Sequence, residues 1–101
     1  MIARIWHGAT TAADAKKYLD YLNGTGVLEC RATEGNQGVY VLSRIEGNTA
    51  HFLFISLWNS YDAIKKFAGA EIDKARYYPE DKEFLLELEP TVAHYEASAF
   101  I

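Results

Sequence analysis

A segment that is apolar on both sides, residues 52–58, constrains the fold of this chain more than any other feature. Alternate side chains of a β-strand point to the same side. The apolar residues of one side are Leu53, Ile55 and Leu57, and those of the other side are Phe52, Phe54 and Trp58. A strand of this kind is typically buried on both faces. The chain must therefore place this strand in a sheet and cover that sheet on both sides.

The patterns around this strand predict a β-α-β-β-α-β order with one added short helix. The expected elements are a strand at 2–7, a helix at 11–24, a strand at 39–45, a strand at 51–58, a helix that begins at Asn59 or Ser60, a short helix at about 79–88 and a strand at about 92–99. The prediction of the first helix rests on a capping box that starts at Thr11 and on Gly24, a residue that commonly ends helices. Residues 27–30 are compatible with an extended conformation. Residues 46–49 predict a turn that joins the two central strands as a hairpin.

This order is that of the ferredoxin-like split βαβ fold, an α+β arrangement with a four-stranded antiparallel sheet and both helices on one face. The expected order across the sheet is fourth, first, third and second strand. The face opposite the helices then has no cover within one chain. Because exposed apolar area costs ~25 cal/mol per Å2, a few uncovered Phe or Leu side chains are unfavourable by several kcal/mol. Since most soluble oligomers are two-fold homodimers, we expect a homodimer that pairs through the sheet.

Length and composition narrow the class of protein. The 101 residues suit a single domain, residues 1–101, and a hydrophobic content of 50% can form its core. The net charge of −4 and the scattered Lys and Arg residues argue against a nucleic-acid partner. No apolar run reaches the ~18 residues of a membrane span, and Arg4 and His7 interrupt the run that a secretory signal needs. With Cys30 as its single cysteine, the chain forms no internal disulfide, and we expect it in the cytoplasm.

The three histidines are expected at one end of the sheet. His7 ends the first strand, while His51 and His94 begin the third and fourth strands, which run in the opposite direction. A cluster on one face would suit proton transfer or metal binding. The alternative is three separate strand-end histidines that contact solvent or main chain.

Several segments resemble the antibiotic biosynthesis monooxygenase family, whose members are dimeric α/β barrels. The resemblance rests on Ser56-Leu57-Trp58-Asn59-Ser60 running into the helix at 63–67, on the start at 1–6, on Ala75-Arg76-Tyr77-Tyr78-Pro79-Glu80-Asp81 and on His94-Tyr95-Glu96. It covers nearly the whole chain in element order and points to an uncharacterised branch.

The family that this chain resembles includes haem-degrading enzymes, but the residues of this chain argue against haem degradation. The haem-degrading branch uses an Asn on the first strand, a Trp on the second helix and a His ten residues later. Phe67 and Tyr77 occupy the last two places here, and the first strand offers only Trp6 and His7. The family also holds cofactor-independent monooxygenases of phenols. Without a dinucleotide-binding glycine pattern or a His-Glu-x-x-His spacing, we expect neither a cofactor nor a metal.

The phenol-oxygenating members carry Trp, Asn, Tyr and Arg around their pocket. Trp58, Asn59, Tyr77 and Arg76 supply these residue types, and Phe67 adds a further expected substrate contact. In the reaction that the resemblance implies, His7 or His94 removes a proton from a phenol or quinol, Arg76 or Asn59 steadies the oxyanion, and Tyr77 donates a proton.

Each of these side chains also has a structural interpretation. Trp58 can pack beneath the following helix, and Asn59 can cap it. Arg76 and Tyr77 can be surface residues that follow a helix. Arg4, within a central strand, needs a partner, and Glu96 on the neighbouring strand is the expected one. Cys30 has no basic neighbours in sequence and is expected to be inert.

Two functions remain open at this stage. The first is a cofactor-free monooxygenase-like enzyme that acts on a small aromatic substrate. The second is a non-catalytic dimeric barrel that binds a small molecule or has a stress-related structural role. A pocket lined by His7, Trp58 and Tyr77 favours the enzyme, whereas a space filled by Phe52, Phe54 and Phe67 favours the structural role.

Overall fold

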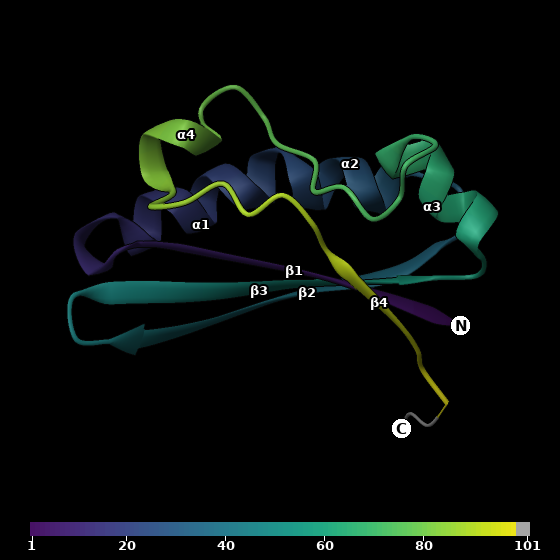
Figure 1. Cartoon of the computed structure of the whole chain (residues 1–101), viewed down its shortest axis with the longest axis horizontal. Coiled ribbons are helices and arrows are strands. Elements are labelled where there is room, and N and C mark those ends of the chain that lie inside the picture. Colours follow the sequence, from purple (N-terminus) through teal and green to yellow (C-terminus); the bar gives the residue numbers. More distant parts are fainter. Residues whose placement is uncertain (99–101) are drawn as a thin grey trace.

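The computed structural model describes residues 1–98, which form an antiparallel sheet with all helices on one face (Figure 1). The elements are β1 (Ile2–Thr11), η1 (Ala12–Asp14), α1 (Ala15–Gly24), α2 (Gly26–Ala32), β2 (Asn36–Glu46), β3 (Thr49–Trp58), α3 (Tyr61–Ala68), α4 (Asp81–Phe84) and β4 (Ala93–Glu96). The predicted ferredoxin-like arrangement is confirmed. In the described part of the chain, no helix has the length and apolarity to cross a membrane.

The strands follow the order β2-β3-β1-β4, which is the predicted one. β1 pairs with β3 from Ile2↔Trp58 to Thr11↔Thr49 and with β4 at its other edge. The hairpin of β2 and β3 turns at Gly47, whose φ of 61° lies in the left-handed region that glycine enters without steric cost. The central position of β1 and β3 brings their side chains under the helices.

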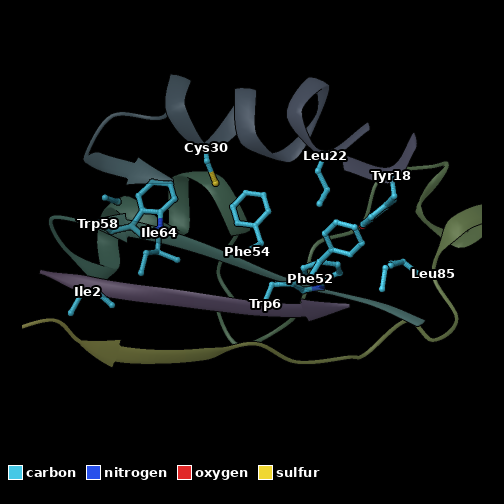
Figure 2. Packing of buried hydrophobic residues seen from close by; sticks show 12 residues of the cluster. Ile2, Trp6, Tyr18, Leu22, Cys30, Phe52, Phe54, Trp58, Ile64 and Leu85 are labelled. Atoms are coloured by element: carbon cyan, nitrogen blue, oxygen red, sulfur yellow. The ribbon is translucent and has the colours of Figure 1, made fainter. Parts of the chain in front are cut away.

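The core lies between the sheet and the helices and is largely aromatic (Figure 2). Its fully buried large side chains include Trp58, Tyr18, Phe52 and Ile64. Each such side chain stabilises the fold by about 1.5–3 kcal/mol relative to an exposed position. The face of β3 with Phe52, Phe54 and Trp58 thus packs on the helices, as the alternation predicted.

The opposite face of the sheet is apolar and open. Leu53 on β3 is 37% exposed, and its neighbour Leu42 on β2 is 48% exposed. Tyr40 and Tyr95 extend the same face to both sheet edges, with 61% and 60% exposure. No part of residues 1–98 covers this surface (Figure 1).

Two expectations for the N-terminal half were wrong. Residues 27–30 are not extended but belong to α2, because Gly26 and Cys30, four residues apart, form its buried side. The first strand also continues past Gly8 to Thr11 in unbroken register with β3. The predicted cap is confirmed, since the Asp14 amide donates to Thr11 Oγ1 (3.3 Å), although the first turn is a 3-10 helix.

The C-terminal part of the chain differs more from the predicted elements. The short helix spans only Asp81–Phe84 rather than 79–88, because the chain turns extended at Leu85 and then runs beside β1, where the Leu86 amide donates to the Ala9 carbonyl (2.9 Å). Leu88 is exposed as a result. β4 is limited to Ala93–Glu96, and the expected end of this strand at residue 99 lies outside the described residues.

Gly8 provides a test of the β1 packing. A Cβ at this position would lie 2.2 Å from Cη2 and 2.5 Å from Cζ2 of the buried Trp6 ring. We expect Gly8→Ala to lower the free energy of unfolding by about 1–3 kcal/mol through overpacking. Chemical denaturation measures this. Gly24→Ala is the control, since its Cβ meets nothing within 4 Å. Equal stability of the two variants would contradict the packing described.

Candidate functional site

A hollow opens between the sheet and the helices beside the segment that follows α3. It contains about 470 Å3 of space free of protein atoms, including its opening to solvent. The residues that line it are Arg4, Trp6, Tyr18, Leu22, Gly26, Phe54, Ser56, Phe67, Arg76, Tyr77, Tyr78, Asp81 and Val92. Small-molecule sites commonly combine apolar walls with a few polar groups in this way. The hollow is therefore the candidate site.

Aromatic rings form much of the wall. Trp6 projects from β1 with its ring centroid 6.3 Å from that of Tyr77 and 6.5 Å from that of Tyr18. Phe54 projects from β3 and Phe67 from α3. Alternation along β1 and β3 delivers Trp6 and Phe54 to the helical side, so the hollow follows directly from the strand pattern.

Asp81 is a buried carboxylate at this site that sequence reasoning missed. It is 3% exposed, and its Oδ1 accepts a hydrogen bond from the Tyr18 hydroxyl (2.9 Å) while Oδ2 accepts from the Tyr78 amide (2.6 Å). Burial raises the pKa of Asp81 and also raises the pKa of Tyr18, which stays protonated. In the sequence, Asp81 resembles an ordinary acidic residue in the first turn of a helix, and its burial has no local signal.

Arg76 lines the hollow and is held in place by main-chain and side-chain contacts. Its guanidinium donates to the Phe67 carbonyl (2.7 Å) and to Glu29 Oε1 (2.6 Å), and it lies 4.9 Å from the Phe67 ring centroid. The Tyr78 hydroxyl donates to the other Glu29 oxygen. This bond, and then Arg76, lowers the pKa of Glu29. Glu29 was missed because its segment was expected to be extended.

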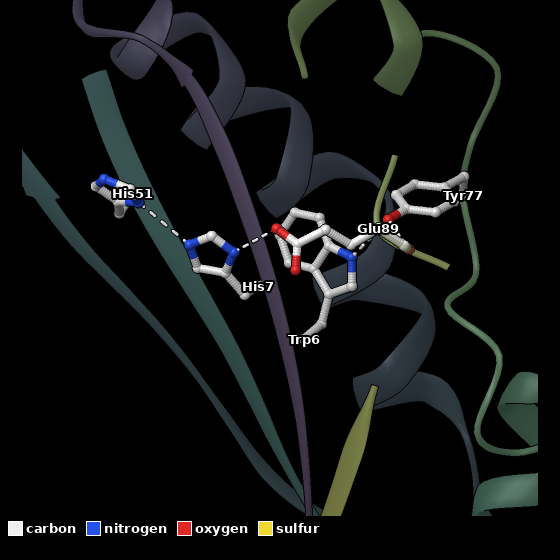
Figure 3. Close-up of polar contacts among 5 residues, drawn as sticks. All are labelled: Trp6, His7, His51, Tyr77 and Glu89. Atoms are coloured by element: carbon white, nitrogen blue, oxygen red, sulfur yellow. Dashed lines mark hydrogen bonds and ion pairs between the residues drawn. The ribbon is translucent and has the colours of Figure 1, made fainter. Parts of the chain in front are cut away.

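Tyr77 also reaches the hollow. Its hydroxyl donates to the Glu89 main-chain carbonyl (2.5 Å) and accepts from Trp6 Nε1 (3.2 Å) (Figure 3). Burial raises the pKa of Tyr77, so the phenol is neutral at physiological pH. Both partners of this hydroxyl belong to the protein, and they fix the ring in the wall of the hollow.

His7 and His51 lie together on the other face of the sheet. His7 Nε2 is 3.2 Å from His51 Nδ1, and His7 Nδ1 is 2.5 Å from Glu89 Oε2 (Figure 3). Because Trp6 points into the hollow, its neighbour His7 points away from it. His7 therefore does not line the hollow.

His94 is separated from the other two histidines. It is paired with Arg4 across β1 and β4, and Arg4 is three residues from His7, so His94 lies on the helical face and the expected three-histidine cluster does not form. Arg4 Nη1 is 3.1 Å from His94 Nε2, which must accept, and Nδ1 faces Asp73 Oδ1 (3.2 Å). Burial, reinforced by Arg4, lowers the pKa of His94.

The prediction that Glu96 is the partner of Arg4 was wrong. Arg4 is buried, and its guanidinium donates to the main-chain carbonyls of Ile72 and Lys74 (3.0 Å for Lys74), in addition to its contact with His94. Glu96 is exposed and lies opposite Ile2 in the register. Carbonyl oxygens satisfy a buried guanidinium without burying a second charge.

The two remaining predicted contacts, Trp58 and Asn59, do not line the hollow. Trp58 is fully buried, donates to Ser56 Oγ (2.8 Å) and packs on Phe67 with ring centroids 5.8 Å apart. Asn59 is exposed, and the cap of α3 is Ser60, whose Oγ accepts from the Ala63 amide (3.2 Å). Trp58 thus supports the hollow from behind Phe67.

The donor set at the site is poor in metal ligands. Over residues 1–98, no group of three or more His, Cys, Asp or Glu side chains is arranged to hold a metal ion. The lining residues include neither histidine nor cysteine. Cys30 is buried, and desolvation raises its pKa to about 12, which removes it as a nucleophile.

The comparisons with known proteins agree on the fold. No protein-family model matches the chain, and no curated protein matches it. A candidate antibiotic biosynthesis monooxygenase from Bacillus cereus has a TM-score of 0.68 at 13% identity, over 99% of this chain and 97% of that one. A second antibiotic biosynthesis monooxygenase has a TM-score of 0.66 at 18% identity, over 98% and 100%. The haem degrader MhuD from Mycobacterium tuberculosis, with two haems bound in its active site, has 0.60 at 16%, over 100% and 99%.

These likenesses confirm the predicted resemblance to the antibiotic biosynthesis monooxygenases at the level of the fold. The same fold also carries a haem degrader. A fold shared by different reactions leaves the reaction to the side chains of the site.

The placement of His94 predicts a pH dependence of stability. Its pKa in the folded chain lies below the ordinary value of 6.5, so the unfolded chain takes up the proton first. The stability that a neutral His94 contributes is complete above pH about 6.5 and is lost as the pH falls below it. We expect thermal unfolding between pH 7.5 and 5.5 to show this fall in the wild type and a smaller fall in His94→Gln, whose amide can replace both ring contacts. Identical pH profiles would contradict it.

Proposed function

We propose that this protein is a monooxygenase-like enzyme that binds a small phenol or quinol in the hollow between sheet and helices, without a cofactor. The observation that carries the proposal is the composition of the hollow: aromatic walls surround one buried carboxylate, Asp81, and two guanidinium groups, those of Arg4 and Arg76. These are the groups that removal of a phenolic proton and stabilisation of the resulting anion require.

The walls favour a flat aromatic ring. Trp6, Phe54 and Phe67 offer ring faces and edges from three different elements. Aromatic pairs prefer edge-to-face or offset contacts with centroids 4.5–7 Å apart. The rings already present follow this geometry, as the Trp6–Tyr77 pair does with planes inclined by 72°. A bound ring can extend the same packing.

Asp81 is our proposed base. Burial raises the pKa of Asp81, so its carboxylate is a stronger base than an exposed one. Its pKa is thereby closer to that of a phenol, which favours transfer of the phenolic proton. The Tyr18 hydroxyl, 2.9 Å from Oδ1, can pass a substrate proton to Asp81 while giving up its own. His7, the base expected earlier, points to the opposite face, and the Nε2 lone pair of His94 is directed at Arg4.

Arg76 is our proposed oxyanion group. Two of its five N–H groups are used by Phe67 and Glu29, and the others remain for a phenolate oxygen. Because Glu29 and the Phe67 carbonyl hold the guanidinium in place, little reorganisation is needed when charge develops. Tyr77 completes the wall beside it.

The oxygen chemistry follows from the anion. Loss of the phenolic proton makes a carbon atom of the ring nucleophilic. This carbon atom then forms a C–O bond with dioxygen. Return of the proton from Asp81 gives a hydroperoxide on a carbon that still bears hydrogen. Loss of water from it leaves a quinone carbonyl, so one oxygen atom enters the product and the other leaves as water.

Oxygen uptake with a panel of hydroxyquinones and their quinols tests this function. We expect turnover in the wild type and a loss of about 10²–10⁴-fold in kcat for Asp81→Asn, the usual effect of removing a general base. Arg76→Gln should lose a similar amount. The controls are Asp62→Asn and Arg31→Gln, which change exposed residues of α3 and α2. No uptake across the panel contradicts the proposal, and an equal loss in His7→Gln would return the role of base to His7.

A non-catalytic binding protein is the second candidate. It is favoured by the hydrogen bonds within the site, because the polar groups of its side chains already bond to protein atoms. These side chains are Arg76, Tyr77, Tyr78 and Asp81. Quenching of tryptophan fluorescence by the same panel separates the two candidates. Binding in the hollow without oxygen uptake favours the second candidate.

We further propose that the protein is a homodimer that pairs through the open face of its sheet. The exposed residues Tyr40, Leu42, Leu53 and Tyr95 spread an apolar surface over all strands of the sheet except β1. Ile5 on β1 and Ile55 on β3 lie between them and are only half-buried. Two copies related by a two-fold axis would cover each other's surface.

Sedimentation at micromolar concentration tests this pairing. We expect a dimer for the wild type and a monomer for Leu53→Glu, since a carboxylate at the centre of the apolar face would be buried without a partner. The control is Leu28→Glu, which changes a leucine that is 59% exposed on α2, on the other side of the molecule. A monomeric wild type would contradict the pairing.

A further inference from the structure

A pair of histidines on the open face has no role in the hollow. His7 on β1 and His51 on the adjacent β3 face each other with ring centroids 5.4 Å apart and ring planes inclined by 29°. The nitrogens that face each other are His7 Nε2 and His51 Nδ1, 3.2 Å apart (Figure 3). In the single chain both side chains are about one-third exposed, so solvent and ions can reach them before two copies pair.

Each ring has a carboxylate on its outer nitrogen. Glu89 Oε2 is 2.5 Å from His7 Nδ1, and Glu46 Oε1 is 3.4 Å from His51 Nε2. A carboxylate accepts hydrogen bonds, so it favours the tautomer that has the proton on the nitrogen next to it. Glu89 therefore favours a proton on Nδ1 of the neutral His7 ring and leaves a lone pair on Nε2, which faces His51 Nδ1.

The lone pair of His7 Nε2 can bind a cation that lies between the two facing nitrogens. The cation is either a proton shared by the rings or a metal ion bound by both. Metal–nitrogen bonds of about 2.0–2.1 Å at a tetrahedral angle place two ligand nitrogens about 3.3 Å apart. The observed 3.2 Å matches this separation without movement of either strand.

The surroundings also suit a cation. Glu46 and Glu89 contribute two negative charges, and Arg44, which donates to Glu46 (3.2 Å), contributes one positive charge. A negative charge therefore remains uncompensated beside the neutral rings. Carboxylates that accept from the outer nitrogens of metal-binding histidines fix the rings and raise their basicity. Glu89 is itself anchored, because its carbonyl accepts from the Tyr77 hydroxyl (2.5 Å).

From this geometry we propose that His7 Nε2 and His51 Nδ1 form a two-ligand site for a divalent transition-metal ion such as Zn²⁺, with Glu89 and Glu46 as its outer carboxylates and with water in the open positions. Imidazole nitrogens suit ions of this class. The site lies on the opposite side of the sheet from the hollow, on the face through which we propose that two copies pair, and it does not depend on the reaction proposed for the hollow.

Calorimetric titration of the chelator-treated full chain with Zn²⁺ tests the site. We expect one Zn²⁺ per chain in the wild type, at least tenfold weaker binding in His7→Gln and in His51→Gln, and about tenfold weaker binding in Glu89→Gln. The matched control is His94→Gln, which removes the third histidine and should bind Zn²⁺ as the wild type does.

A measurement on the wild type alone complements the variants. In histidine-ring ¹⁵N spectra, Zn²⁺ should shift His7 Nε2 and His51 Nδ1 and leave both nitrogens of His94 unchanged. Absence of Zn²⁺ binding in the wild type overturns the proposal. Binding that survives both His7→Gln and His51→Gln, or ¹⁵N shifts at His94 instead of the pair, overturns it as well.

Discussion

The burial of β3 on the helices is the constraint on which the rest of the structure depends. Phe52, Phe54 and Trp58 occupy one side of this strand, and together they form the floor of the core. The helices must lie across them, because these side chains lose their stabilising effect if they meet water. β1 is paired with β3 along its full length, so its own alternation places Trp6 beneath the helices.

The candidate site arises where this packing is incomplete. The segment after α3 has little regular structure, and it brings Arg76, Tyr77, Tyr78 and Asp81 over the sheet. Their polar groups are satisfied by main-chain atoms and by Glu29 and Tyr18, and no buried side-chain polar atom in the described part of the chain lacks a partner. Protein contacts therefore already orient the polar groups of the site, which favours binding by reducing the cost of ordering.

The sequence was sufficient for the fold because its main signals are local and periodic. Alternation in β3, the Thr11 cap and the turn at Gly47 each depend on a few neighbouring residues, and together they lead to one topology. The helix α2 and the bounds of α4 were missed because tertiary contacts decide them. Cys30 is buried on the inner side of α2 despite the β-favouring Val27 in the same helix, and the Leu86 amide bonds to β1 where a helix was expected.

The site was only partly predictable for the same reason. Arg76, Tyr77 and Phe67 were found through the resemblance and do line the hollow. Asp81 was not found, because nothing in its neighbourhood in sequence indicates that Tyr18, far away in the chain, will bury it. His7 was expected to end the first strand but lies within β1, and the face of each histidine depends on register, where one residue reverses the side.

Glu89 connects the two faces of the sheet. Its carbonyl holds the Tyr77 hydroxyl at the hollow, and its carboxylate holds the His7 ring on the far side, around the edge of β1 (Figure 3). A molecule that draws the Tyr77 hydroxyl toward itself would loosen Glu89 and with it the orientation of His7. Thermodynamic linkage makes such an effect mutual. A ligand bound in the hollow and an ion bound by the histidines would each change the affinity for the other by the same factor.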